Sequence, residues 1–88
     1  MGKKEKLHLK AKTSPTNFTF KNICELTGLV GFDLKRKTGS HIIYKHPVHG
    51  LMMNIQRDKR DKSKAKLYQI KELLSYIDNF NLMEDNNV

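Results

Sequence analysis

The apolar residues of this chain change their spacing twice, and this change constrains the fold more than any other feature of the sequence. From 20 to 29 they recur three and four residues apart, which predicts a helix with Thr19 as N-cap and Gly31 just beyond its end. From 32 to 56 the pattern alternates, which predicts strands. From 65 to 80 the helical spacing returns, so a second helix is expected there.

Two predicted turns divide the strand region. Thr38 and Gly39 form one tight turn, and the segment 46–50, which contains a proline and ends in glycine, forms the other. The three strands expected are 32–37, 40–45 and 51–56. Short strands joined by tight turns form an antiparallel meander. The predicted fold class is therefore α+β, in the order α-β-β-β-α, with two helices on one face of a three-stranded antiparallel sheet.

The 88 residues fit one domain, flanked by polar ends. Residues 1–17 are rich in lysine and interrupted by Pro15, so we expect a flexible or loosely docked basic arm. The folded domain is expected over 18–82, and the acidic, amide-rich tail 83–88 is expected to fray.

The sequence also bounds the compartment. Its single cysteine, Cys24, cannot form an internal disulfide and fits a reducing environment. The N-terminus lacks the apolar core of a secretory signal, and no stretch approaches the roughly 20 apolar residues of a membrane span. We expect a cytoplasmic protein that does not contact a membrane.

Positive charge is the strongest indication of a partner. Seventeen lysines and arginines against nine acidic residues give a formal net charge of +8, which attracts polyanions with an affinity that falls with salt. Lys62, Lys64 and Lys66 precede the second predicted helix, whose N-terminus itself attracts phosphate. In double-stranded-RNA-binding domains a lysine cluster at this place contacts the RNA backbone. The sequence therefore favours an RNA-binding surface over the alternative, a solvated basic turn.

The candidate catalytic residue is His41, which follows Gly39 and Ser40 at the start of the second predicted strand. Strand alternation places it on the face opposite the helices. A neutral imidazole there is able to take the proton of an RNA 2′-hydroxyl, and Lys37 and Lys45 are candidates to neutralise the charge that develops on phosphorus. On these residues alone, a surface or structural histidine is the more common explanation.

The histidines His41, His46 and His49 also raise the question of a metal site. Their spacing resembles a ligand set, but no cysteine or carboxylate lies close in sequence to complete it. Unrelated surface histidines explain the pattern better, so we expect no metal and no cofactor.

The sequence from 31 to 47 contains the pattern on which a family resemblance rests. Gly-Phe-Asp-Leu at 31–34 is followed by Lys-Thr-Gly-Ser-His-Ile-Ile-Tyr-Lys-His-Pro at 37–47. Together with the collinear segments 53–56, 64–70 and 76–82, this pattern resembles the HicA family of toxins from type II toxin–antitoxin pairs. The resemblance covers roughly residues 18–82.

The resemblance implies a double-stranded-RNA-binding-like fold and an endoribonuclease (mRNA interferase) activity on messenger or other single-stranded RNA. It implies a HicB-type antitoxin that forms a hetero-oligomer with the toxin and covers its active face. The family's catalytic histidine corresponds to His41, and a lysine or Tyr44 is a candidate to assist it. Residues expected to contact RNA are Lys35, Lys37, Ser40, Lys45, Lys62, Lys64 and Lys66. The alternatives left open are a non-catalytic RNA-binding module and a protein whose basic surface pairs with an acidic protein.

Overall fold

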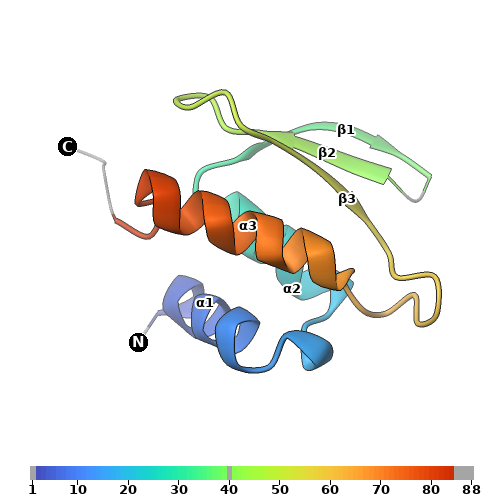
Figure 1. Cartoon of the computed structure of the whole chain (residues 1–88). Helices are drawn as coiled ribbons and strands as arrows, with labels where there is room; N and C mark the ends of the chain where they lie inside the picture. The colour runs from blue at the N-terminus through green and yellow to red at the C-terminus, as the bar shows by residue number, and fades with distance from the viewer. Residues whose placement is uncertain (1, 40, 85–88) are drawn as a thin grey trace.

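The structure, a computed structural model, describes residues 2–39 and 41–84, and within them it is an α+β fold (Figure 1). Its helical elements are α1 (Lys3–Thr13), the 3₁₀ turn η1 (Pro15–Asn17), α2 (Phe20–Leu29) and α3 (Leu67–Phe80). Its strands are β1 (Asp33–Thr38), β2 (His41–Lys45) and β3 (Met52–Gln56). The predicted order of helix, three strands and helix is confirmed from α2 to α3, and α1 precedes it.

The three strands form the antiparallel meander predicted from the alternating pattern, in the order β1-β2-β3. In β2, Ile42 is buried and faces the helices, whereas His41 is exposed on the other face. Residues that pair across antiparallel strands share a face, so Ile55 joins Ile42 and Gln56 joins His41. Figure 1 shows α2 and α3 on one side of the sheet and no described element on the other.

Local signals fix the ends of α2. The Thr19 side chain accepts a hydrogen bond from the Asn22 amide at 3.0 Å, and the Asn22 side chain accepts one from the Thr19 amide, which completes a capping box. Gly31 follows the helix with a φ of 106°, a conformation that favours glycine. Both predicted helix ends are therefore confirmed.

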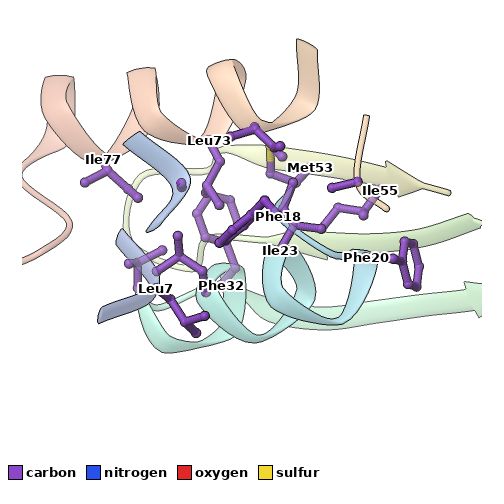
Figure 2. Close-up of a cluster of buried hydrophobic side chains, with 14 of the residues drawn as sticks. Leu7, Phe18, Phe20, Ile23, Phe32, Met53, Ile55, Leu73 and Ile77 are labelled. Atoms are coloured by element: carbon purple, nitrogen blue, oxygen red, sulfur yellow. The ribbon is translucent and has the colours of Figure 1, made fainter. Parts of the chain in front are cut away.

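The core lies between the sheet and the two helices that cover it. Phe18, fully buried at 0% exposure, lies among side chains from the sheet and both helices (Figure 2). The other fully buried large apolar residues are Ile23, Leu26, Met53, Ile55, Ile70, Leu73 and Ile77. They come from α2, β3 and α3, so these three elements are held together by one apolar cluster.

The N-terminal segment differs from the prediction, because residues 3–13 form α1 rather than a flexible basic arm. Leu7 and Ala11, one turn apart, are buried in the core cluster. Lys3 forms an ion pair with Glu25, which ties α1 to α2. Figure 1 shows α1 on the side of α2 and α3 that faces away from the sheet. The segment is thus a third layer of the fold.

At the other end of the chain, the predicted frayed tail lies largely outside the described residues, which stop at Glu84. Leu82 is buried and Met83 packs partly against the core, so the folded part reaches at least Met83. Within the described residues, no helix has the length and apolar character needed to cross a membrane.

Candidate active site and nucleic-acid interface

An open groove of about 510 Å³ lies beside His41, at the end of the sheet where β2 begins and β3 ends. Figure 1 shows that the loop after β3 folds back to the same end of the molecule as the β1–β2 turn. The lining residues are Gly39, His41, Gln56, Arg57, Asp58, Lys59, Lys62 and Lys66. The structure thus places the exposed candidate histidine among several cations that are distant from it in sequence.

The loop that carries these cations is held in place by Arg57. Its Nη1 donates a hydrogen bond to the Lys62 carbonyl at 2.8 Å, and its guanidinium carbon lies 4.1 Å from the centre of the Phe20 ring. Arg57 also pairs with Ala65 in an isolated β-bridge. These contacts close the loop on itself and fasten it to the first turn of α2, so Arg57 both lines and supports the groove.

The three lysines predicted to bind RNA before α3 divide into two groups. Lys64 is in an extended segment, where it pairs with Thr19 in a β-bridge, and side chains in such a segment alternate in direction. Lys62 and Lys66 line the groove beside His41. Lys64 instead donates a hydrogen bond from its ammonium group to the Thr16 carbonyl at 2.8 Å. Two of the three are therefore available in the groove, and the third ties the N-terminal segment down.

Lys66 is held at one edge of the groove by two side-chain contacts. Its ammonium donates a hydrogen bond to the Gln56 side-chain oxygen at 2.8 Å and lies 5.8 Å from the centre of the Tyr68 ring. Gln56 is the register partner of His41, so these contacts place Lys66 next to the histidine. Lys66 is also the N-cap residue of α3, whose first amides receive no side-chain cap. The edge of the groove at α3 therefore attracts anions.

Asp58 is the one carboxylate among the described residues that line this groove. Its Oδ1 accepts hydrogen bonds from the backbone amides of Arg60, at 2.7 Å, and Asp61, at 3.4 Å. The carboxylate therefore shapes the loop. Positive charge outweighs it in the groove, which makes the groove suited to a phosphodiester.

The other predicted contact residues lie away from this groove. Lys35 falls at a β-bulge, where the β1–β2 register shifts between Leu34 and Arg36. As a result Lys37 pairs with buried Ile42 and lies on the helix-covered face, contrary to its expected role beside His41. The side chain that reaches the open face is that of Arg36, which pairs with Ile43.

Two further candidates are separated from His41 by the geometry of β2. Lys45 shares its face but lies four residues along the strand, roughly 13 Å away. Tyr44 is on the opposite face, partly buried against the core and in contact with Cys24, so it does not reach His41 as an assisting group. Ser40, the remaining candidate, lies outside the described residues.

The histidine trio also separates in space. The rings of His46 and His49 lie 4.9 Å apart near the β2–β3 turn, whereas His41 is at the other end of β2. His46 is only 6% exposed, and its Nδ1 accepts hydrogen bonds from the amides of Val48 and His49 at 3.3 Å. Burial lowers the pKa of His46, and the neighbouring His49 lowers it further. His46 is therefore a structural residue, contrary to the expectation of a surface histidine.

No cluster of three or more potential metal ligands from histidine, cysteine, aspartate and glutamate occurs within residues 2–39 and 41–84. The candidate site therefore consists of His41 and the cations that line its groove.

Sequence reasoning missed four residues that line the groove: Gln56, Arg57, Asp58 and Lys59. The register across the β2–β3 hairpin was the available signal for Gln56, because the turn 46–50 sets which residue pairs with His41. For the other three, the sequence offered only a charged run, whose folded path depends on contacts with α2.

Searches of protein-family models, of curated proteins and of solved structures found no match to this chain.

Proposed function

We propose that this protein is a HicA-type toxin, a cytoplasmic endoribonuclease that cleaves messenger or other single-stranded RNA with His41. The proposal includes a double-stranded-RNA-binding-like arrangement of α2, β1–β3 and α3, and a HicB-type antitoxin that covers the groove. The observation that supports it best is the position of an exposed histidine in a groove with Lys59, Lys62 and Lys66. That combination pairs a proton acceptor with cations able to hold a phosphodiester.

The proposed reaction needs only the RNA itself as nucleophile. The neutral imidazole of His41 takes the proton from a 2′-hydroxyl, and the resulting oxygen attacks the adjacent phosphorus. The bond from phosphorus to the 5′ oxygen of the next nucleotide breaks, that oxygen takes a proton from water, and the His41 imidazolium returns its proton to water. The products are a 2′,3′-cyclic phosphate and a 5′-hydroxyl. Lys62 and Lys66 stabilise the extra negative charge on the phosphorane.

A metal ion is not part of this proposal, because the donor set around His41 is poor in carboxylates. Asp58 accepts backbone hydrogen bonds within its own loop, and the other charged side chains of the groove are cationic. Hard divalent cations prefer several oxygen ligands. We therefore expect cleavage to continue in EDTA.

The test compares wild type, His41→Ala and the matched control His49→Ala on a long single-stranded RNA in EDTA. Loss of the proton acceptor is expected to lower the cleavage rate about 10²- to 10⁴-fold, while RNA binding and the activity of His49→Ala are retained. The RNA ends are then analysed for the cyclic phosphate. Equal cleavage by wild type and His41→Ala would refute the proposal. Binding without cleavage by all three proteins would indicate a non-catalytic RNA-binding module.

A further inference from the structure

A second groove lies next to the His41 groove, between the open face of the sheet and the first turns of α3. It is lined by residues of β2, β3 and the first turns of α3: Ile43, Met52, Asn54, Gln56, Tyr68, Gln69 and Glu72. Gln56 lines both grooves, so the two are adjacent. The lining changes at this residue, from mainly cationic side chains to apolar and uncharged polar ones with a single carboxylate, that of Glu72.

Tyr68 is the prominent side chain of this second groove. It is 60% exposed although it is a large aromatic residue on a helix that packs against the sheet. Met52, exposed on β3, and Ile43 on β2 form the apolar floor beside it. Exposed aromatic and apolar side chains next to a phosphate-binding surface are how proteins hold unpaired bases, because every base has a flat face that stacks on an aromatic ring.

The charges of the second groove also favour a base over a phosphate. Among the described residues that line it, none is basic, and Glu72 contributes a carboxylate. A phosphate would be repelled there, whereas Glu72 and Asn54 offer hydrogen-bonding groups of the kind that contact base edges. Lys66 lies at the junction of the two grooves, 5.8 Å from the Tyr68 ring centre. Phosphate and base sites are therefore adjacent and separate.

The spacing matches one extended strand of RNA. His41 and Ile43 lie on the same face of β2, two residues and hence roughly 7 Å apart. A phosphate placed at His41 brings a neighbouring nucleotide of an extended strand over Ile43. In a duplex the base faces are stacked inside the helix and are unavailable for Tyr68.

From these observations we infer that the second groove seats an unpaired base next to the cleaved phosphate, stacked on Tyr68, so that the substrate is single-stranded. This inference rests on the proposed ribonuclease function and assigns Tyr68 as a substrate-positioning residue of the same site. The phenol oxygen is not required for stacking, whereas the ring is.

The test measures RNA binding in the His41→Ala background, where the substrate is expected to stay intact. A fluorescein-labelled ten-nucleotide single strand and the blunt duplex of the same sequence are titrated by fluorescence anisotropy at fixed salt. Tyr68→Leu is expected to weaken binding of the single strand about 5- to 150-fold and to leave duplex binding within about twofold. Tyr68→Phe is expected to bind as the parent does. Phe80→Leu, at the far end of α3, is the matched control.

Equal weakening for single strand and duplex, or no weakening for either, would overturn the inference. Melting curves from circular dichroism check that each variant is folded, and because Tyr68 is exposed, Tyr68→Leu is expected to melt as the parent does. The proposed function fails separately, if His41→Ala cleaves as wild type does. If cleavage depends on His41 but RNA binding is unchanged by Tyr68→Leu, the proposed function stands and this inference is wrong.

Discussion

The side chain of Gln69 protects the free edge of β3, and replacing it with methionine tests how much this contact contributes. Gln69 is on α3 and is only 2% exposed. Its amide nitrogen donates a hydrogen bond to the Asn54 carbonyl, and its amide oxygen accepts one from the Gln56 amide at 3.0 Å. One side-chain amide thus takes the place of a neighbouring strand, which satisfies an edge that would otherwise be open.

The expected cost of Gln69→Met follows from these two hydrogen bonds. Methionine has a similar length and flexibility, so the substitution removes polar groups without leaving a large void. A buried backbone group that loses its partner costs about 1–3 kcal/mol, and two are affected here. Two such groups would give about 2–6 kcal/mol, and because both hydrogen bonds are only partly buried we expect the free energy of unfolding to fall by the lower part of this range, about 2–4 kcal/mol. For a domain of this size that corresponds to a melting temperature lower by about 10–30 °C.

Urea unfolding followed by circular dichroism measures this loss. The slope of the unfolding free energy against urea concentration should stay unchanged, because the substitution does not alter the surface exposed on unfolding. The matched control is Lys71→Met, an exposed position on the same helix, with an expected change within about 0.5 kcal/mol. Hydrogen exchange at the Gln56 amide should accelerate specifically in Gln69→Met. A variant as stable as wild type, with unchanged exchange at Gln56, would refute this account of the sheet edge.

Two further predictions concern the ends of the fold. Leu7→Ala is expected to lower the free energy of unfolding by about 2 kcal/mol or more, because Leu7 is buried in the core cluster. Leu9→Ala, on the exposed side of α1, should have little effect in the same urea titration. Equal effects of the two substitutions would argue against a docked α1. The lowered pKa of His46 means that the unfolded chain binds the proton more tightly, so stability is complete above about pH 6.5 and falls as the pH drops below that value. Unfolding titrations between pH 7.5 and 5 should show a smaller decline for His46→Gln, and an identical decline would contradict the structural role of His46.

The elements that sequence reasoning predicted correctly are those with local signals. Thr19 and Gly31 mark the ends of α2 through their own backbone and side-chain chemistry, and the turn 46–50 separates β2 from β3 in the same way. The second helix was predicted to start at 65, two residues early. Ala65 instead pairs with Arg57 in a β-bridge, so its backbone is committed to an extended conformation before α3 begins.

The helix α1 could not be predicted with the same reasoning because its apolar surface is so small. Leu7 and Ala11 are its buried residues, and most of the others are lysine or polar. Its attachment depends on residues far along the chain, such as Glu25, which pairs with Lys3, and Asn22, which accepts a hydrogen bond from Lys10 at 3.3 Å. Pro15 interrupts the basic segment in the sequence, and in the structure it begins the short turn that follows the helix.

In the candidate site, the prediction of an exposed His41 on the open face needed only strand alternation, and the structure places it there. The bulge at Lys35 was not visible in the sequence, and it reverses the face on which Lys37 lies. One extra residue in a strand is enough to do this, because side chains alternate with a period of two. Alternation alone therefore predicts the face of each side chain correctly in β2 but not in β1 beyond the bulge.

The distribution of charge explains why a net charge of +8 did not locate the site. Five of the lysines are on α1, which packs on the side of α2 and α3 away from the sheet (Figure 1). Lys35 and Lys37 are on β1, a bulged edge strand, and Lys64 donates a hydrogen bond to the Thr16 carbonyl. What distinguishes the His41 groove is the path of the loop after β3, fixed by Arg57 against Phe20. That path is decided by contacts between segments almost forty residues apart. The location of the groove is thus a tertiary property, although its histidine could be identified from the sequence.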